Sequence, residues 1–376
     1  MKIAIPTRSF NNHGGISRCI YALSKIYSRK HEVHIFSSNF EPADFITSHL
    51  VPSAKSPPFL AEYTFASNVQ SALDNFDADI TYAPSSACWR ADVFTANSCH
   101  KAAIEIFRKQ RGISYSLLKA FEPKSRVVLE IERYNYQKGH YKKITALSER
   151  VKGELMQYYK VPPEDIRVVP PGVDTDVFFP DGKKKKELCE KYSILQSTPL
   201  FLFCGHEFKR KGLAQAIGAL GKLDKALDWR LIVIGGDNRA PYISLAQKLG
   251  IEQKIIFAGF VKDISAYFNA CDAFIFPTAY EPYGMVITEA LSSGMPVITP
   301  RIAGAAELMT HEKDGFLLES AFDEVEIAKY ASLLLSDKKL RQKMGAAARK
   351  TAQKYTWEKI AKKMMGVFEE AIDLKK

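Results

Sequence analysis

The chain has 376 residues, 46% of them hydrophobic and 25% charged, and it carries a formal net charge of +11 at pH 7. A single hydrophobic core stops growing at about 250–300 residues, so this length predicts two domains. The composition is that of an ordinary soluble protein. No long apolar run predicts a membrane-spanning helix, and KIAIP at 2–6 is too short for the apolar region of a signal peptide.

The six cysteines are scattered along the chain and never form a CxxC pair. This spacing argues against a zinc site and a disulfide framework, and it favours reduced thiols in the cytoplasm. The positive net charge would suit nucleic-acid binding, but no nucleic-acid recognition motif accompanies it. We therefore expect a cytoplasmic protein with no metal and no nucleic-acid partner.

Short apolar segments alternate with amphipathic ones along the chain. In the first half we expect strands at KIAIP, EVHIF, DITYAP and DVFTAN, and a helix after Gly15. A second cycle begins near Pro199 with PLFLFCG, RLIVIGG, KIIFAGF, AFIFP and PVITP, each expected to lead into a helix. This alternation predicts α/β architecture with parallel sheets covered on both faces.

A segment rich in proline, glycine and charge, VVPPGVDTDVFFPDGKKKKE at 168–187, separates the two cycles. Its composition is typical of an interdomain linker. The lysine run at 183–186 is expected to be the solvated start of a helix. Two such sheets facing one another would place strand carboxyl ends around a shared cleft, where open α/β sheets bind ligands.

Two carboxylates flank a predicted strand-to-helix junction in TAYEPYGMVITEALSSGMPVITP (278–300). Glu281 lies in the loop, and Glu289 lies in a helix expected over 285–293 and capped by Gly294. A helical spacing would separate them by roughly 12 Å, whereas a retaining glycosidase holds its pair about 5 Å apart. They are therefore expected to hold two ends of one extended ligand, with a phosphate at the helix N-terminus between them.

This segment resembles the donor-site signature of family-4 retaining glycosyltransferases. The stretch at 148–180 resembles the interdomain segment of that family, and GHEFKRKGLAQAI (205–217) resembles its phosphate-binding lysine loop. HGGISR (13–18) is similar to its glycine-rich loop, and YTWEKIAKK (355–363) to its C-terminal crossover helix. The matches occur in order over nearly the whole chain, which is far more specific than a lone glycine pattern.

The resemblance implies the GT-B fold, in which two Rossmann-like domains face a central cleft. It implies an acceptor-binding domain at 1–168, a nucleotide-sugar-binding domain at 169–355, and a helix at 356–376 that returns to the first domain. The implied activity is the transfer of a hexose, with retention, from a nucleotide diphosphate sugar to an acceptor hydroxyl. A UDP-linked donor and a glycolipid or glycan acceptor are expected.

The resemblance also assigns roles in the donor site. Glu281 would accept hydrogen bonds from hydroxyls of the donor sugar, and Glu289 would accept two hydroxyls of the ribose. The backbone between them would lie against the sugar and the diphosphate, at Tyr283, Gly284, Met285 and Val286. For Glu289, a charge on the helix surface with no ligand is the alternative.

Two cations, Arg210 and Lys211, follow the strand that ends at Gly205. In the family picture they neutralise the charge that develops on the leaving diphosphate. Many members have an arginine directly after this glycine, where the present chain has His206, so Arg210 is expected to replace that phosphate contact. An exposed helix start is the alternative for the pair. No Asp-x-Asp stretch lies beside the phosphate site, so neither a metal nor another cofactor is expected.

Three residues of the first domain complete the expected site. Gly14 and Gly15 open a helix after a strand, so their N–H groups could approach the phosphates from the opposite side. His100 follows a strand in TANSCH, where many family members keep a histidine near the sugar and acceptor. It would position the sugar, because same-face attack lets the leaving phosphate take the acceptor's proton. A structural hydrogen-bonding role is the alternative.

Positive charge is concentrated at 101–143, a segment that contains eleven Lys or Arg but only four Glu, with apolar residues interleaved between them. The segment resembles the basic stretch by which lipopolysaccharide-core glucosyltransferases dock to the inner membrane. An anionic membrane surface is therefore an expected partner. The alternative is that these are the solvated faces of two ordinary helices.

Two other functions are compatible with the sequence. One is a sugar phosphorylase or a sucrose-type synthase of similar fold. The other is a non-catalytic nucleotide-binding or scaffolding protein, which is disfavoured because both glutamates and the Arg-Lys pair occur together.

Overall fold

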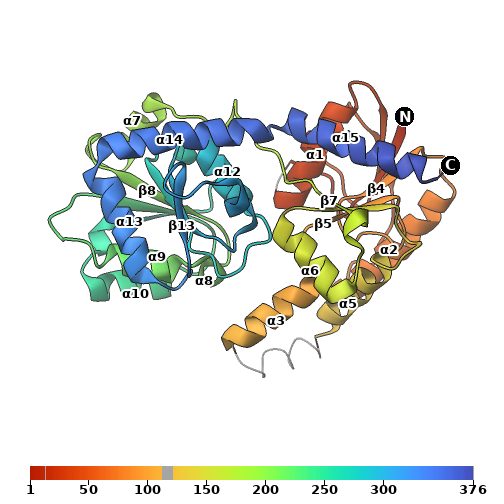
Figure 1. The fold of residues 1–376 in the computed structure, drawn as a ribbon, viewed down its shortest axis with the longest axis horizontal. Helices are drawn as coiled ribbons and strands as arrows, with labels where there is room; N and C mark the ends of the chain where they lie inside the picture. The colour runs from red at the N-terminus through yellow and green to blue at the C-terminus, as the bar shows by residue number, and fades with distance from the viewer. Residues whose placement is uncertain (13, 112–121, 376) are drawn as a thin grey trace. The chain divides into compact units, whose positions relative to one another are not determined.

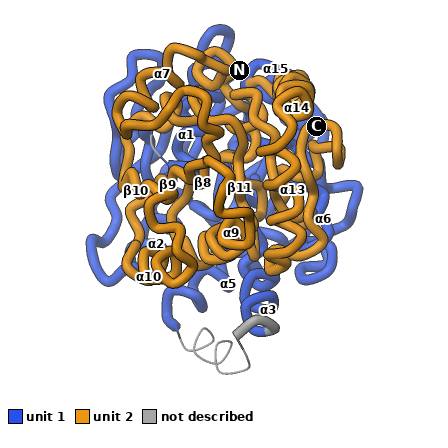
Figure 2. Tube along the Cα trace, turned by 90° about the vertical axis from the view of Figure 1, so that its left-hand side faces the viewer, with its two compact units in different colours: residues 1–172, 357–376 blue, residues 173–356 orange. Residues whose placement is uncertain are grey.

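The computed structural model describes residues 1–12, 14–111 and 122–375, without the side chains of 109–111. The chain forms two compact units (Figure 2), unit 1 with Met1–Gly172 and Trp357–Lys376, and unit 2 with Val173–Thr356. The domain boundaries implied by the sequence resemblance are at residues 168 and 355, and those of the structure are at 172 and 356. Each unit is built on a sheet of its own.

Unit 1 is built on a seven-stranded sheet in the order β3-β2-β1-β4-β5-β6-β7 (Figure 1), in which all neighbouring strands are parallel. Its strands are β1 (Lys2–Pro6), β2 (Glu32–Ser37), β3 (Thr47–Leu50), β4 (Ile80–Ala83), β5 (Val93–Ala96), β6 (Lys143–Ala146) and β7 (Ile166–Val168). Its described helices are α1 (Gly15–Tyr27), α2 (Pro58–Asp74), α3 (His100–Arg111), α5 (Pro123–Asn135), α6 (Glu149–Tyr159), the 3-10 turn η1 (Pro163–Asp165) and α15 (Trp357–Asp373).

Unit 2 holds a six-stranded parallel sheet in the order β10-β9-β8-β11-β12-β13. Its strands are β8 (Leu200–Cys204), β9 (Arg230–Ile234), β10 (Ile255–Gly259), β11 (Ala273–Ile275), β12 (Val297–Pro300) and β13 (Gly315–Leu318). Its α-helices are α7 (Gly182–Lys191), α8 (Phe208–Lys211), α9 (Leu213–Leu220), α10 (Ala240–Leu249), α11 (Ser265–Phe268), α12 (Met285–Ser292), α13 (Glu324–Ser336) and α14 (Lys338–Ala352). The 3-10 turns are η2 (Glu252–Lys254), η3 (Gly304–Leu308) and η4 (Gln353–Tyr355).

The inner strands are apolar because they are buried between the helices that cover the faces of each sheet. Every residue of β8 is buried, and its sequence LFLFC is a continuous apolar run. The last helix, α15, packs on unit 1, where the buried ring of Phe368 lies 5.8 Å from Tyr27 and 5.2 Å from Tyr82, measured between ring centroids. The segment after 356 therefore completes the first unit, as the sequence predicts.

Both sheets share one topological feature, a reversal of strand order beside their first strand. In unit 1 the chain runs outward from β1 through β2 to β3, then returns to the other side of β1 with β4. In unit 2 the chain does the same from β8, returning with β11. Open α/β sheets bind ligands in the crevice at the carboxyl ends of strands at such a switch point.

The predicted strands and the helix after Gly15 are confirmed, with two differences. The sequence prediction omitted β3, β6, β7 and β13, which have only three or four residues each. The expectation that every strand of the second cycle leads into an α-helix is wrong for β12, which is followed by η3 and then β13. At the start of η3, the backbone N–H groups of Gly304 and Ala305 donate to the carbonyls of Glu281 and Tyr283 in the loop after β11.

The lysine run opens α7 as predicted, behind the N-cap Asp181, whose carboxylate accepts from Lys183 N and Lys184 N. It is not solvated throughout, because Lys185 Nζ donates to both carboxylate oxygens of Asp272 at 2.6 and 2.8 Å. The six cysteines are free thiols, five of them buried. Among the described helices, none combines the length and apolar character needed to cross a bilayer.

Candidate functional site

The loops that follow β8 and β11 lie side by side at the switch point of unit 2. The backbone N–H of Ala279 donates to the carbonyl of Arg210 at 2.9 Å, and the Thr278 hydroxyl donates to the same carbonyl at 3.3 Å. These contacts join the β8–α8 loop to the β11–α12 loop through their main chains. Side chains from the two loops are therefore held at one place.

Gly212, between α8 and α9, allows this close approach. Its φ of +82° lies in the left-handed region, and a Cβ at this position would stand 2.0 Å from the carbonyl oxygen of Pro277. Only glycine satisfies both conditions. The residue directly before it is Lys211, whose backbone position is thereby fixed against the loop after β11.

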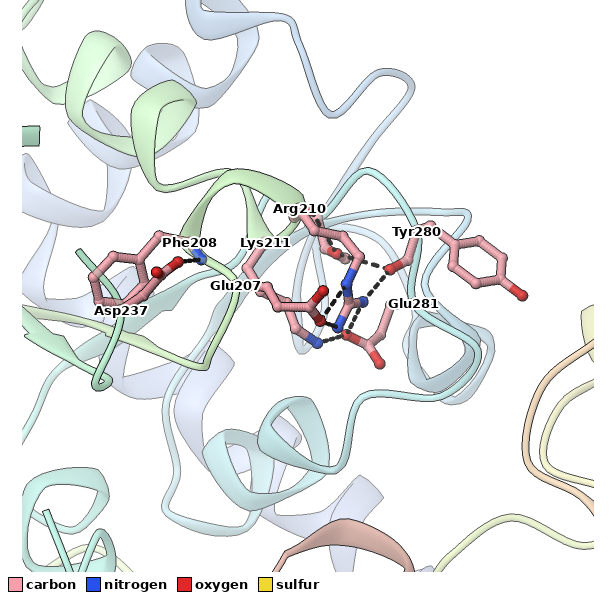
Figure 3. Close-up of polar contacts among 8 residues, drawn as sticks. Glu207, Phe208, Arg210, Lys211, Asp237, Tyr280 and Glu281 are labelled. Atoms are coloured by element: carbon pink, nitrogen blue, oxygen red, sulfur yellow. Dashed lines mark hydrogen bonds and ion pairs between the residues drawn. The ribbon is translucent and has the colours of Figure 1, made fainter. Parts of the chain in front are cut away.

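The two cations converge on Glu281 (Figure 3). Lys211 Nζ donates to Glu281 Oε2, and Arg210 Nη1 lies 3.6 Å from the same oxygen. Arg210 Nη1 also donates to the carbonyl of Tyr280 at 2.7 Å. The side chains of Lys211, Glu281 and Arg210 are only 12%, 11% and 19% exposed, which rules out the alternative of an exposed helix start.

The electrostatics of this cluster are set by burial. Removal from water lowers the pKa of Lys211, and the neighbouring Glu281 carboxylate opposes that shift. The ammonium also lies 5.1 Å from the centroid of the Phe276 ring, a cation–π distance. A positive charge that is poorly solvated and held in place will attract an anion strongly.

Hydrogen bonds from η3 hold the segment between Glu281 and α12 in place. Gly304 N donates to the carbonyl of Glu281 at 3.0 Å, and Ala305 N donates to that of Tyr283 at 2.8 Å. Gly284 takes φ +92° and precedes the first turn of α12, which begins at Met285 with Val286 next to it. A Cβ on Gly284 would lie 2.9 Å from Glu281 Cγ, so glycine here keeps the carboxylate side chain in its place.

Glu289 lies within α12 and is 2% exposed. The alternative of a charge on the helix surface is therefore wrong. Burying a carboxylate is unfavourable unless it is compensated.

In unit 1, Gly14 and Gly15 stand between β1 and α1 at the switch point of that sheet. Gly14 has φ +77°, and α1 begins at Gly15 without a side-chain cap. A Cβ on either glycine would meet nothing within 4 Å. The left-handed backbone of Gly14, rather than tight packing, is therefore the reason for glycine at this position.

His100 begins α3 after β5 and is held by hydrogen bonds on two sides. Its Nε2 lies 2.7 Å from the hydroxyl of buried Ser125, and its backbone N donates to both carboxylate oxygens of Glu132 at 3.1 and 3.2 Å. The Tyr159 hydroxyl donates to Glu132 at 2.6 Å. Burial raises the pKa of Glu132 to about 7, although the hydrogen bonds from Tyr159 and His100 oppose the shift.

Two family models match successive parts of the chain. The model described as Glycosyltransferase Family 4 matches residues 13–177, and the one described as Glycosyl transferases group 1 matches residues 184–351. The chain therefore belongs to the glycosyltransferase family that these two models describe. A curated relative, lipopolysaccharide glucosyltransferase WaaG of Escherichia coli K12, is 25% identical over 350 residues, which cover 89% of this chain and 90% of that protein.

Solved structures agree with the glycosyltransferase fold. The crystal structure of WaaG aligns with a TM-score of 0.82 at 22% identity, covering 97% of this chain and 99% of that one. The structure of Anabaena HepE in complex with UDP-glucose aligns with a TM-score of 0.75 at 19% identity, covering 98% and 99%. Likeness at these identities shows the fold, which is GT-B with two Rossmann-like units.

In this glycosyltransferase, the predicted residues fall into two groups. Within unit 2 the structure brings Arg210, Lys211 and Glu281 into direct contact. Gly205 directly follows β8, and Gly284 directly precedes α12. Gly14, Gly15 and His100 belong to unit 1. The positions of all these residues relative to strand ends are as the sequence predicts, while their roles toward substrate stay predictions.

Sequence reasoning missed three acidic residues of the glycosyltransferase. Glu207 pairs with Arg210, Asp237 accepts from the Phe208 N–H at 2.9 Å at the start of α8, and Glu132 holds the start of α3. A signal existed for Asp237, because it follows β9, the parallel neighbour of β8. Carboxyl ends of neighbouring parallel strands meet at one edge of a sheet.

The raised pKa of Glu132 predicts a pH-dependent stability. Its pKa is about 7 in the folded chain against an ordinary value of 4.5, so its contribution is fully present below pH 4.5 and is lost as pH rises through 7. Between pH 5 and 8, we expect wild type to lose about 2–3 kcal/mol of unfolding free energy relative to Glu132→Gln. Urea denaturation at several pH values measures this. The control is exposed Glu130→Gln, and parallel curves for wild type and Glu132→Gln would contradict the assignment.

Proposed function

We propose that this glycosyltransferase moves a hexose, with retention and without a metal, from a UDP-linked sugar to a hydroxyl of a glycolipid or cell-surface glycan precursor. The observation that carries the proposal is the contact of Arg210 and Lys211 with Glu281 at the switch point of unit 2. Two cations suit a diphosphate, and an adjacent carboxylate suits sugar hydroxyls. The fold shared with HepE, whose structure contains UDP-glucose, supports a UDP-linked donor.

The transfer needs one bond broken and one formed at the anomeric carbon. The bond from this carbon to the diphosphate oxygen breaks, and negative charge grows on the leaving group. Arg210 and Lys211 stabilise that charge from fixed positions, and electrostatic stabilisation of this kind usually accelerates a reaction more than any other single effect. The acceptor hydroxyl attacks from the same face, and its proton passes to the departing phosphate oxygen, so no protein nucleophile is required.

The buried pair is suited to this step. The burial that lowers the pKa of Lys211 means that its charge is weakly screened by water. The Glu281 carboxylate favours the protonated form of Lys211. Its oxygens can also accept hydrogen bonds from sugar hydroxyls. Glu289, buried further along α12, is proposed to accept the ribose hydroxyls.

Substitutions should distinguish the roles of Glu281 and Glu289 in turnover and in nucleotide binding. Glu281→Gln is expected to leave UDP affinity within about threefold of wild type and to lower kcat at least tenfold, because it loses contacts made to the transferring sugar. Glu289→Ala is expected to weaken UDP binding about tenfold or more, since it removes hydrogen bonds to a charged acceptor. Calorimetry with UDP and turnover of UDP-sugars measure both effects.

Exposed Glu252→Gln in unit 2 is the matched control for these variants, and thermal unfolding shows whether each is folded. Equal loss of UDP affinity in both glutamate variants would contradict the separate roles. Turnover only with inorganic phosphate as acceptor would instead identify a phosphorylase. Absence of turnover with any nucleotide sugar would leave a nucleotide-binding protein.

Activity should persist without divalent cations, because Arg210 and Lys211 take the place that a metal ion occupies in other transferases. We expect EDTA treatment to change the rate of transfer by less than about twofold. The Arg210→Gln variant serves as the sensitive reference, since it should lose activity with or without magnesium. Activity that disappears with EDTA and returns with magnesium or manganese would overturn this expectation.

We further propose that the enzyme works at an anionic membrane surface through 101–143, on the cytoplasmic face. Residues 112–121 and the side chains of 109–111 lie outside the described part of the segment. In the described part, Arg108, Lys138 and Lys143 are paired with Glu105, Asp165 and Glu370. Three cations of α5 are exposed and form no ion pair with any residue that the structure describes, namely Lys124, Arg126 and Arg133.

Apolar side chains lie close to one of these cations, Arg133, which lines a cavity. A cavity of about 1010 Å³ opens between α3, α5 and α6. Its walls include the side chains Ile104, Leu129, Tyr136, Tyr141 and Tyr158. Cations beside apolar and tyrosine side chains suit the headgroup region of a bilayer.

The membrane proposal is tested by sedimentation with vesicles. The enzyme should bind vesicles that contain phosphatidylglycerol at low salt and be released as salt rises. Changing Lys124, Arg126 and Arg133 to Ser should weaken binding about a hundredfold, at about 1 kcal/mol for each cation. The matched control changes three exposed or half-exposed lysines of α7 in unit 2 (183, 184 and 186) to Ser. Equal binding to neutral vesicles, or equal loss in both triple variants, would contradict a specific electrostatic contact.

A further inference from the structure

Glu207 occupies the hydrogen-bonding edge of Arg210 (Figure 3). Its Oε2 accepts from Arg210 Nε at 2.9 Å and from Arg210 Nη2 at 2.6 Å. The third nitrogen, Nη1, donates to the Tyr280 carbonyl. All three nitrogens of the guanidinium are therefore engaged within unit 2.

The backbone of Glu207 holds its carboxylate in this position. Its φ and ψ are both 57°, in the left-handed region that residues other than glycine rarely adopt. Its carbonyl accepts from Arg210 N at 2.8 Å and from Lys211 N at 3.1 Å, which forms the turn of α8. A residue kept in a sparsely populated conformation near a binding site is a candidate for function.

A phosphate and Glu207 would compete for the same donors. Arginine binds a phosphate or a carboxylate most strongly through two parallel N–H groups, and the Nε and Nη2 edge is one such pair. Glu207 already uses this edge. An oxyanion of a diphosphate can take it only when the Glu207 carboxylate moves away.

The exposures of the two side chains indicate which one would move. The Glu207 side chain is 65% exposed, whereas that of Arg210 is 19% exposed and is tied to the loop after β11. Rotation of Glu207 into solvent exchanges an exposed ion pair for hydration, and exposed ion pairs contribute little. Arg210 can stay in place during the exchange.

We propose that Glu207 is a resident competitor of the donor diphosphate for Arg210, and that it lowers the affinity of the enzyme for the nucleoside diphosphate product. This inference rests on the proposed function. A diphosphate displaces the carboxylate because it carries more charge and also reaches Lys211. After transfer, the return of Glu207 to Arg210 favours release of the product, a step that limits turnover in many enzymes.

The test is a double-substitution cycle by calorimetry with UDP at low salt. Glu207→Gln should bind UDP about three- to fivefold more tightly than wild type, as expected for removal of an exposed ion pair. Arg210→Gln alone should weaken UDP binding. In the Arg210→Gln background, Glu207→Gln should give no further gain, because the competed group is gone.

A matched control separates competition from general charge. Glu190→Gln removes another exposed glutamate of unit 2, one that lies 3.9 Å from Lys186 Nζ, and it should leave UDP affinity unchanged. Steady-state rates give a second readout, since Glu207→Gln should lower the inhibition constant of UDP by the same factor as its dissociation constant. Damage to the fold cannot produce such a gain in affinity.

Three results would overturn the inference. These are unchanged or weaker UDP binding by Glu207→Gln while Arg210→Gln still weakens it, an equal gain from Glu190→Gln, and a full gain that persists in the Arg210→Gln background. The last would indicate long-range charge rather than competition at Arg210. Failure of the proposed function gives a different pattern, in which Arg210→Gln leaves UDP binding unaffected.

Discussion

The close approach of the loops after β8 and β11 is the constraint on which the site in unit 2 depends. Gly212 takes a left-handed backbone, and its missing Cβ leaves room for the carbonyl of Pro277. The hydrogen bond from Ala279 to Arg210 then joins the two loops through their main chains. Since backbone contacts fix the attachment points, the cations and Glu281 need little ordering of their own before a ligand can bind.

Two ion pairs of opposite character meet on these loops. The Lys211–Glu281 pair is nearly dehydrated, and a buried pair contributes little stability after its desolvation cost is counted. The Arg210–Glu207 pair is half open to water and is weak for a different reason, because solvent screens it. The first pair is held firmly in place, and the second can be exchanged for solvent or a ligand. A site that must bind a substrate and release a product of similar charge needs both properties.

The sequence predicted those features that depend on neighbours along the chain. The burial of Glu289 followed from the apolar residues around it in one helix, and the position of His100 followed from the strand before it. The contact of the Glu207 carboxylate with Arg210 could not be predicted, because it requires a left-handed backbone at a residue that is not glycine. The strand β3 was missed because most of its residues are exposed at a sheet edge, so it lacks the apolar run by which buried strands are found.

The two units show that strand order determines where a site lies but not what it binds. Both sheets reverse beside their first strand, so both offer a crevice at the same topological position. In unit 2, cations and carboxylates occupy the loops there, whereas in unit 1 the corresponding loop after β1 presents the exposed backbone of Gly14 and Gly15. Also in unit 1, the backbone N–H of His100 is held by the buried carboxylate of Glu132.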